Sequence, residues 1–510
     1  MNRQIRRVAA AVGVLILALL INLNVVQVVQ SSSLSNNPGN RRVILGEYST
    51  PRGQIIVDGA AIADSIPTND ELKYLRSYPN GPVYAPLTGY YSLDYGKNGL
   101  EDTEDAVLQG TDNRLLGSRI GDILTGRDPK GGSVVLTIDS AAQTAAYNAM
   151  AKQRGAVVAL DPTTGAILAA VSVPSYDPNQ LSSHNADAIT AYWNSLNPSS
   201  SSSPLLNRAF NQTYPPGSTF KLVVSAAALK AGKLPTDQIP APTTLVLPDG
   251  GGTSLQNFGG EKCGDGVTDS FANALAISCN TAFAGLGMSL GADALTSEAR
   301  LFGINDQRSS VPLAVAASTM GPINSQGDLA HASIGQQSVR ITPLQDAMLA
   351  AAAANGGTLM KPYLVAQERA PDLSVISRTK PQQFSQVLDT NQADLLAQMM
   401  VGVVQTGTGT AAKISDIPGV TVGGKTGTAD TGLCANGQPL SSTGACPGST
   451  VAAPDAWFTG FADASGVPKI AVAVIIENGG VNGNETTGGL AAAPIAKAVM
   501  EAYLQAGGGR

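Results

Sequence analysis

The first strong pattern along the chain is an apolar run near its N-terminus. Residues 8–29 are apolar except for three side-chain amides, and Arg3, Arg6 and Arg7 precede them with no acidic residue. The run is long enough for a helix to cross a bilayer, which takes about 20 residues. Because cationic flanks stay on the cytoplasmic side, we expect the rest of the chain to lie outside the cytoplasm. A cleaved signal peptide is the alternative, but no good small-residue cleavage site follows, which favours an uncleaved anchor.

Three further patterns predict elements of the main body. Residues 155–160 and 166–171 are apolar on either side of an Asp-Pro-Thr-Thr-Gly turn, which is typical of two paired strands. Residues 220–229 are almost uninterruptedly apolar, and a helix that is apolar all round is buried. Residues 420–428 alternate like a strand and then become rich in glycine, as expected where another backbone approaches closely. A peptide could pair along such a strand.

Length and composition narrow the class of protein. At 510 residues the chain is too long for one ordinary core, so we expect more than one domain. Charged residues make up 14% of the chain, against about 25% in typical domains. The net charge is −6 and there is no basic run, so the sequence has no nucleic-acid-binding footprint.

A serine lies three positions before a lysine where the buried helix is predicted to begin, in Ser218-Thr219-Phe220-Lys221. Residues three apart share a helix face. Lys221 would lie at the edge of a core and near the positive end of the helix dipole. Both effects favour a neutral amine, which can act as a base toward the Ser218 hydroxyl. Alone, the motif is weak, because Ser-x-x-Lys arises by chance and usually marks a solvated helix face.

Two further elements follow in order. Ser278-Cys279-Asn280 lies between two apolar segments of helical character, where it can present a hydroxyl and an amide to a cleft, although alone it could be a helix cap. Lys425-Thr426-Gly427-Thr428 ends the glycine-rich strand, although alone it could be the end of a hairpin. The ordered trio is the signature of active-site serine enzymes that react with penicillins, with Ser-x-Asn as a variant middle element. Together the three elements predict one active site.

Shorter motifs surround the trio. They are Asn207-Arg208-Ala209-Phe210-Asn211, Ile334-Gly335-Gln336, Thr342-Pro343-Leu344-Gln345, Ala354-Asn355-Gly356-Gly357 and Trp457-Phe458-Thr459-Gly460-Phe461. With the trio and the strand pair, they resemble the transpeptidase domain of penicillin-binding proteins over about residues 136–505. Upstream, Arg52-Gly53-Gln54-Ile55-Ile56-Val57-Asp58 and Gly99-Leu100-Glu101 resemble the pedestal, or dimerisation, domain of class B, the monofunctional transpeptidases, in their short actinobacterial form.

The resemblance implies the fold and the domain organisation. We expect an α/β (α+β) penicillin-binding transpeptidase and β-lactamase-like fold, in which helices flank an antiparallel sheet. Residues 1–30 would form the cytoplasmic N-terminus and transmembrane anchor, residues 31–135 a small, mainly β pedestal domain, and residues 136–510 the transpeptidase domain. The implied location is the cell membrane, crossed once, with the catalytic domain outside the cytoplasm.

The resemblance also implies the activity, that of a serine-type D-Ala-D-Ala transpeptidase. Ser218, activated by Lys221, would attack the carbonyl between the last two D-alanines of a peptidoglycan stem peptide, and an amine of a neighbouring stem would then take the acyl group. Ser278 would relay a proton to the leaving amine, and Asn280 would hold the substrate's peptide bond. β-Lactams would acylate Ser218 and stop the cycle.

The third motif would bind the substrate. Lys425 and Thr426 would hold its carboxylate, and Gly427 and Thr428 complete the binding strand. The backbone N–H groups of Ser218 and Thr428 would form the oxyanion hole, a contribution usually worth several kcal/mol.

Four cysteines fall in the exported catalytic domain, where disulfides persist. They allow three pairings. Proximity in the sequence favours Cys263 with Cys279, inside the middle motif, and Cys434 with Cys446, in an insert after the third motif. Their spacings match none of the usual zinc ligand pairs, so we expect no metal, and the reaction needs no cofactor.

Several alternatives differ in the acceptor or in catalysis itself. A D,D-carboxypeptidase uses water as acceptor, and the pedestal argues against it without deciding. A non-enzymatic β-lactam sensor or scaffold would have further membrane spans or a decayed trio. A β-lactamase needs a deacylating Glu in a Glu-x-x-Leu-Asn loop, and the nearest match, at Glu298, has Phe302 where Asn is needed, on an ordinary helical stretch. With only His184 and His331, a Ser-His-Asp triad has no suitable setting.

The expected partners are peptidoglycan stem peptides, β-lactam antibiotics and a membrane glycosyltransferase of the shape, elongation, division and sporulation (SEDS) class. The anchor and the pedestal are the expected contacts for that glycosyltransferase. The sequence leaves open the third residue of the stem peptide, the acceptor, and a role in elongation or in division.

Overall fold

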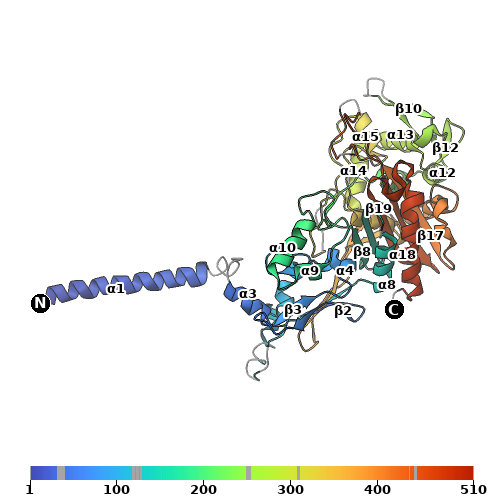
Figure 1. Ribbon diagram of the computed structural model, residues 1–510. Helices are drawn as coiled ribbons and strands as arrows, with labels where there is room; N and C mark the ends of the chain where they lie inside the picture. The colour runs from blue at the N-terminus through green and yellow to red at the C-terminus, as the bar shows by residue number, and fades with distance from the viewer. Residues whose placement is uncertain are drawn as a thin grey trace.

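The structure is a computed structural model that describes residues 2–30, 41–117, 129–150, 152–248, 254–306, 311–435, 437–441 and 445–508, with Gly121 and Gly126. Its N-terminal helix α1 (Asn2–Asn24) continues into a π-helical turn (Val25–Val29) and stands apart from the body (Figure 1). Within the described residues, Arg3–Val29 is the one helix long and apolar enough to cross a membrane, and its apolar window is not buried against the protein.

A six-stranded sheet, in the order β15-β14-β6-β1-β2-β3, contains the strands of the predicted pedestal. Its strands are β1 (Ile55–Val57), β2 (Ala60–Pro67), β3 (Tyr74–Ser77), β6 (Ser133–Leu136), β14 (Val365–Arg369) and β15 (Val375–Arg378). The last two come from between the second and third catalytic motifs in the sequence. The pedestal sheet is therefore built from two distant parts of the chain.

A buried ion network joins the two pedestal motifs, because it pairs Arg52 of the first with Glu101 of the second. The carboxylate of Glu101, fully buried, accepts from Nε of Arg52 at 2.5 Å and from Nε of Arg76 at 2.7 Å. Burial alone would raise the pKa of Glu101, but the two guanidinium groups hold it below its ordinary value. Breaking such a buried pair leaves an uncompensated charge, which typically costs about 3–5 kcal/mol.

The body is organised around an antiparallel sheet in the order β17-β18-β19-β7-β8. Its strands are β7 (Gly155–Leu160), β8 (Ile167–Val173), β17 (Thr421–Ala429), β18 (Asp455–Ala464) and β19 (Val467–Ile476). β7 and β8 form the hairpin that the sequence predicts, and β17 carries the third motif. An antiparallel sheet flanked by helices is the fold that the sequence predicts, and it is confirmed.

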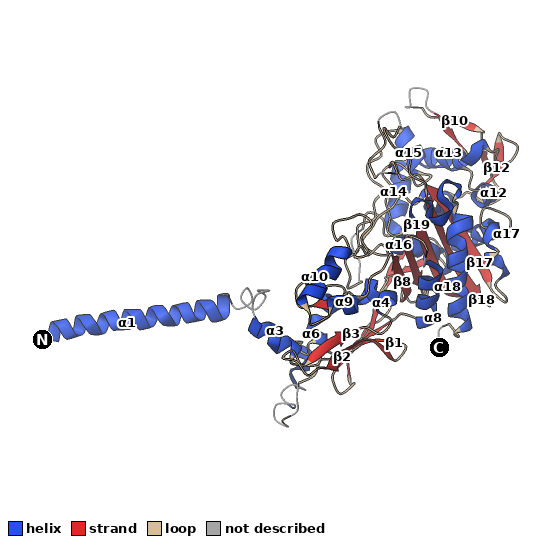
Figure 2. Ribbon diagram, in the orientation of Figure 1, coloured by secondary structure: helices blue, strands red, loops and turns tan. Residues whose placement is uncertain are grey.

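Helices cover both faces of this sheet (Figure 2). One face packs against α8 (Ser140–Met150) and α18 (Ala493–Gln505), and the other against α16 (Pro343–Ala354), with α11 (Lys221–Lys230) and α17 (Thr390–Gln405) beside it. Along β19, Ala471, Ala473 and Ile475 enter one core, whereas Val472 and Val474 enter the other. Successive strand residues point to opposite faces, so a sheet covered on both sides has continuously apolar strands.

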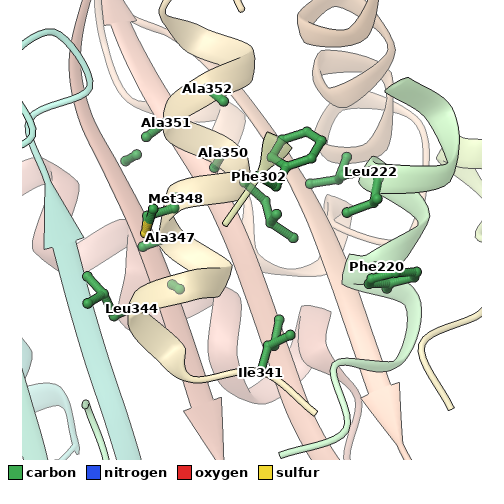
Figure 3. Close-up of a cluster of buried hydrophobic side chains, with 14 of the residues drawn as sticks. Phe220, Leu222, Phe302, Ile341, Leu344, Ala347, Met348, Ala350, Ala351 and Ala352 are labelled. Atoms are coloured by element: carbon green, nitrogen blue, oxygen red, sulfur yellow. The ribbon is translucent and has the colours of Figure 1, made fainter. Parts of the chain in front are cut away.

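The larger core lies between α11 and α16. Figure 3 shows Phe220 and Leu222 at the start of α11, Phe302, and apolar residues of α16 in one cluster. Nine of the ten residues of α11 are buried, as its unbroken apolar pattern predicts. The core therefore fixes the turn that begins α11.

Toward the top of Figure 1 lie the helices α12 (Phe271–Ala276), α13 (Asn280–Leu290), α14 (Ala292–Leu301) and α15 (Gln326–Ala332). Two short antiparallel strand pairs accompany them, β9 (Gln238–Pro240) with β12 (Thr268–Ser270) and β10 (Thr244–Val246) with β11 (Ser254–Gln256). The other helices and strands are α3 (Arg41–Tyr48), α4 (Gly81–Thr88), β4 (Tyr91–Ser92), β5 (Gly96–Lys97), α5 (Leu100–Thr103), α6 (Asp105–Leu108), α9 (Pro178–Leu181), α10 (Ala186–Ser195), β13 (Thr358–Met360) and β16 (Gln383–Gln386).

Candidate active site

A cleft of about 670 Å³ brings the three predicted motifs together. Six of the predicted residues line it: Ser218, Ser278, Asn280, Thr426, Gly427 and Thr428. The other two, Lys221 and Lys425, are fully buried beneath. All eight predicted catalytic and binding residues thus meet at one place.

Ser218 lies in a short 3-10 turn, Gly217–Phe220, that runs directly into α11. Gly217 has φ +55°, and a Cβ there would stand 2.8 Å from the carbonyl oxygen of Thr428. Its N–H donates to the carbonyl of Gly335 at 3.0 Å, and Trp457 Nε1 donates to the carbonyl of Pro215 at 2.9 Å. Close backbone packing therefore holds the Ser218 turn against the strand of the third motif.

The middle motif occupies the loop between α12 and α13, as predicted. Ser278 has φ +62°, in the left-handed region, where residues other than Gly, Asn and Asp are uncommon. The N–H of Cys279 donates to the carbonyl of Ala274 at 2.8 Å, which closes the turn, and Asn280 begins α13. This backbone carries the Ser278 hydroxyl and the Asn280 amide toward the two lysines.

The Ser278 hydroxyl lies between two lysine amines. Its Oγ is 2.9 Å from Nζ of Lys425 and 3.2 Å from Nζ of Lys221. Lys221 Nζ also lies 2.7 Å from the carbonyl oxygen of Ser278 and 2.8 Å from Oδ1 of Asn280, and Lys425 Nζ lies 2.9 Å from the carbonyl oxygen of Thr426. A neutral Lys221 can donate to the two closer oxygens and still keep its lone pair for a hydroxyl proton.

Burial shifts the charge state of both lysines. It holds the pKa of Lys221 well below the ordinary 10.5, and the neighbouring Lys425 lowers it further. Burial lowers the pKa of Lys425 to about 7. The site therefore favours a neutral Lys221, as the sequence predicts, next to a Lys425 that exchanges its proton near neutrality.

Only glycine fits at position 427 of β17. A Cβ there would stand 2.9 Å from the carbonyl oxygen of Pro216 and 2.9 Å from Cβ of Trp457. The strand can therefore approach the Ser218 turn closely enough for both to line one cleft, as the glycine-rich pattern predicts.

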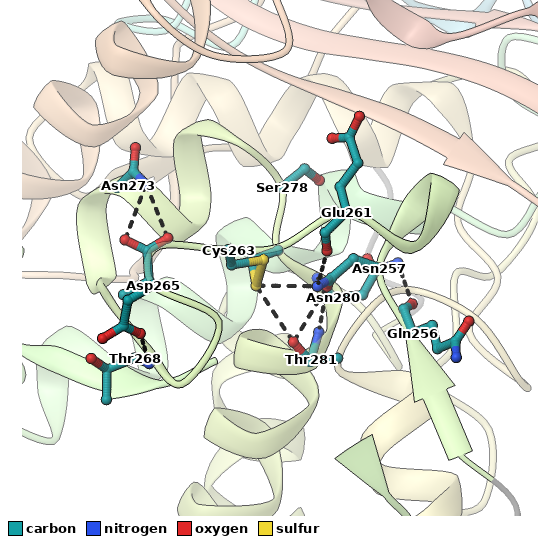
Figure 4. Close-up of a disulfide and its surroundings, with 12 residues drawn as sticks. Gln256, Asn257, Glu261, Cys263, Asp265, Thr268, Asn273, Ser278, Asn280 and Thr281 are labelled. Carbon is teal, nitrogen blue, oxygen red and sulfur yellow. Dashed lines mark hydrogen bonds between the residues drawn. A yellow bond between two sulfur atoms is a disulfide. The ribbon is translucent and has the colours of Figure 1, made fainter. Parts of the chain in front are cut away.

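Both cysteine pairs are joined as expected. Cys263–Cys279 lies inside the middle motif (Figure 4), and Cys434–Cys446 lies in the insert after β17. Within the described residues, no group of His, Cys, Asp and Glu could hold a metal ion.

Three residues bear on the alternative mechanisms, a deacylating glutamate and a Ser-His-Asp triad. Glu298 lies in α14, outside the cleft, and pairs with Lys230 Nζ at 2.7 Å, so it is not positioned to activate a deacylating water. His331 lines the cleft, and its Nδ1 lies 2.9 Å from the carbonyl oxygen of Gly327. His184 pairs instead with Asp70 of the pedestal at 2.6 Å.

The sequence missed several residues of the cleft. Thr408 contacts the Thr426 hydroxyl, and Thr487 and Gly488 form another part of the wall. Asn257 is buried beside the middle motif and bonds to the start of α13. Nothing in the local sequence marks these residues, because each reaches the site only through long-range packing.

Comparison with known proteins gives two family matches. The family described as penicillin binding protein transpeptidase domain matches residues 155–501, and the one described as penicillin binding protein A dimerisation domain matches residues 52–134.

Individual relatives match over nearly the whole chain. Peptidoglycan D,D-transpeptidase PbpA of Mycolicibacterium smegmatis is 46% identical over 99% of this chain and 100% of its own, and PbpA of Mycobacterium tuberculosis is 46% identical over 99% of both chains. The ceftriaxone acyl-enzyme complex of penicillin-binding protein A from M. tuberculosis superposes with a TM-score of 0.84 at 46% identity, over 90% of this chain and 100% of that one. Its penicillin G acyl-enzyme superposes with a TM-score of 0.81 at 45% identity, over 89% and 100%.

Proposed function

This chain belongs to the penicillin-binding protein transpeptidase family, and from that premise we propose that it cross-links peptidoglycan stem peptides through an acyl-enzyme on Ser218. It is a peptidoglycan D,D-transpeptidase and a target of β-lactams, in keeping with its 46% identity to proteins of that name and with the acyl-enzyme complexes of a similar protein. Support for the roles of individual residues comes from the geometry of the cleft.

The observation that carries the mechanism is the position of Ser278 Oγ between Lys221 Nζ and Lys425 Nζ, in the cleft that Ser218 lines. Neutral Lys221 takes the proton of Ser218 as its Oγ attacks the carbonyl between the last two D-alanines. When the C–N bond breaks, the proton passes from Lys221 through the Ser278 hydroxyl to the leaving amine, and D-alanine departs. Lys425 donates to Ser278 Oγ throughout and helps to hold it in place.

The remaining residues hold the substrate. The Asn280 amide binds the peptide bond of the stem, and Lys425 and Thr426 attract its terminal carboxylate. The N–H groups of Ser218 and Thr428 stabilise the developing oxyanion, since the turn and the strand that carry them pack together. An amine of a neighbouring stem then attacks the acyl-enzyme, loses its proton through the same relay, and leaves Ser218 free.

The N-terminal helix supports a membrane location. It is a candidate span by length and composition, and its three leading arginines favour a cytoplasmic N-terminus. We place residues 1–30 in the anchor, 31–135 in the pedestal and 136–510 in the transpeptidase domain, which then lies outside the cytoplasm. The anchor and the pedestal are the surfaces we assign to a membrane glycosyltransferase of the SEDS class.

Mass spectrometry of the full-length protein with penicillin tests the assignment. Wild-type protein gains the mass of one penicilloyl group on the peptide that contains Ser218, and Ser218→Ala gains none. Lys221→Ala slows adduct formation by about 10²–10⁴-fold, because the hydroxyl loses its base. Ser225→Ala is the matched control, because its buried Oγ has no hydrogen-bond partner among the described residues. We expect this variant to be labelled as wild type is.

The lifetime of the adduct separates this function from a β-lactamase. With Glu298 paired to Lys230 outside the cleft, we expect the adduct to persist for many minutes. Retention of a covalent adduct by Ser218→Ala would overturn the assignment of the nucleophile. Turnover of many penicillin molecules per second would overturn the transpeptidase assignment.

A further inference from the structure

Residues 254–263 belong to none of the three catalytic motifs, but they contact the middle motif through Cys263, Asn257 and Gln256 (Figure 4). We propose that Asn257 in this segment is a positioning residue that sets Ser278 and Asn280 for acylation of Ser218. The inference rests on the proposed function, because its readout is the acylation rate. Asn257 itself lines the wall of the cleft, and its hydrogen bonds go to Glu261, to the backbone N–H of Asn280 and to Thr281.

The side chain of Asn257 caps a helix that has no cap of its own. The residue before α13, Cys279, makes no side-chain capping bond, and its sulfur is joined to Cys263. Instead, Oδ1 of Asn257 accepts from the N–H of Asn280 at 2.9 Å, from the N–H of Thr281 at 3.1 Å and from the Thr281 hydroxyl at 3.3 Å. The first N–H groups of a helix have no partner within it, so a distant Asn here takes the place of a local cap.

The segment also fixes Asn257 itself. Asn257 is only 9% exposed, and its Nδ2 donates to the carbonyl of Glu261 at 3.0 Å. Its neighbour Gln256 offers a carbonyl oxygen at 3.4 Å to Nδ2 of Asn280. The segment therefore holds Asn280 by both its backbone N–H and its side chain, while Oδ1 of Asn280 lies 2.8 Å from Nζ of Lys221.

The left-handed backbone of Ser278 needs contacts from other parts of the chain to stabilise it. A left-handed serine is a strained backbone, and such residues persist where surrounding contacts over-determine them. The disulfide ties Cys279 to Cys263 through rotatable bonds, which limits the distance of the loop but not its direction. The Asn257 cap accepts from two consecutive N–H groups, so it sets the direction in which α13 begins and hence where Ser278 and Asn280 point.

Two substitutions at Asn257 test the proposal in the full-length protein. Asn257→Leu keeps the approximate size and removes the acceptor, whereas Asn257→Asp keeps an acceptor oxygen. Stopped-flow acylation by penicillin, at a temperature where each variant is fully folded by circular dichroism, gives the binding constant and the acylation rate constant separately. For Asn257→Leu we expect the acylation rate constant to fall by about 3- to 30-fold, the range obtained when the stability lost with a helix cap is expressed as a fold-change in rate. For Asn257→Asp we expect recovery to within about threefold of wild type.

Asn185→Leu is the matched control, since Asn185 Oδ1 caps α10, outside the cleft, with the same chemistry. It should lower the melting temperature to a similar extent and leave the acylation rate constant unchanged. Wild-type acylation by Asn257→Leu, or an Asn257→Asp protein as slow as Asn257→Leu, would overturn the positioning role. A wild-type protein that forms no adduct on Ser218 would overturn the proposed function instead.

Discussion

The two buried lysines divide the work of the site through their charge states. An ordinary lysine with a pKa of 10.5 would make acylation rise about tenfold per pH unit between pH 7 and 10, since only its neutral form is a base. Burial and Lys425 hold the pKa of Lys221 well below that value. We therefore expect the acylation rate constant at saturating penicillin to level off well below pH 10 instead of climbing tenfold per unit up to that pH.

Lys425 should affect a different quantity, the affinity for penicillin. Its pKa is about 7 in the free protein, so it loses its charge as pH rises through 7 and attracts the carboxylate of penicillin less strongly. Affinity for penicillin should therefore weaken above about pH 7. Stopped-flow measurements from pH 5.5 to 9.5 separate the two effects. A rate constant that climbs tenfold per unit to pH 10 would show that Lys221 is an ordinary lysine.

Asp346, near the start of α16, is a buried acid that the mechanism does not use. Burial raises its pKa from 3.8 to about 7, and a side-chain contact with Thr219 offsets only part of that rise. The folded state therefore holds the proton more tightly than the unfolded state. The resulting stability is fully present below pH 3.8 and is lost as pH rises through about 7.

Asp346→Asn should remove this pH dependence, since the amide stays neutral at every pH. We expect the variant to exceed wild type in unfolding free energy at pH 8 by up to a few kcal/mol, with a smaller difference at pH 5. Urea unfolding at both pH values measures it, with Asp394→Asn on the exposed face of α17 as the charge-matched control. An equal effect at the two pH values would contradict the titration of Asp346.

At the scale of elements, the site depends on how closely β17 approaches the Ser218 turn. In Gly427→Ala the added Cβ, 2.9 Å from the Pro216 carbonyl, forces the strand and the turn apart. A shift of about 1 Å in an active site can lower the rate by 10²-fold, so we expect acylation to fall by at least tenfold in a folded protein. Adduct formation and circular dichroism on the same sample check both parts.

Gly402→Ala provides the control for that substitution. Gly402 lies in α17, which packs against β17, and a Cβ there meets nothing within 4 Å. Alanine within a helix is favoured over glycine by about 0.5–1 kcal/mol. We expect normal acylation and slightly higher stability. Normal acylation in Gly427→Ala as well would show that β17 has room to adjust.

The sequence predicted those elements whose pattern is local. The apolar run of α11, the hairpin of β7 and β8 and the glycine-rich end of β17 each carry their own signal, and the three motifs carry their chemistry within a few residues. The sequence could not predict that Asn257 caps α13 from 23 residues away, because a buried capping Asn looks like any loop Asn. The left-handed Ser278 is hidden for the same reason, since tertiary contacts impose it.

At the scale of the whole molecule, long-range contacts likewise limit how much of the domain organisation the sequence can predict. Sequence order suggests that the pedestal ends near residue 135, yet β14 and β15 return to its sheet from residues 365–378. Gly131 packs so closely that a Cβ would stand 1.8 Å from the carbonyl of Leu108. Pairing between strands so far apart leaves no local periodicity to detect. The shared sheet couples the orientation of the pedestal to that of the catalytic body.

The sheet shared by the pedestal and the body determines what removal of the pedestal should do. A protein that begins at Gly131 keeps every residue that lines the cleft, from Ser218 to Gly489, so we expect it to form the penicilloyl adduct where it folds. It loses β1, β2 and β3 and leaves β6 as an open edge, which favours aggregation and lowers stability. Labelled penicillin and a thermal melt measure the two effects.

In cells, the expectation for the pedestal is different. An anchored protein that lacks residues 50–130 should fail to support wall synthesis even though it is acylated, because positioning and partner contact are the work left for a domain with no nucleophile and base of its own. Full-length Ser218→Ala, which keeps the pedestal and loses the chemistry, is the complementary control and should fail as well. Full complementation by the pedestal-less protein would mean that the pedestal is only a spacer, and the proposed glycosyltransferase contact would then be left to the anchor or the body.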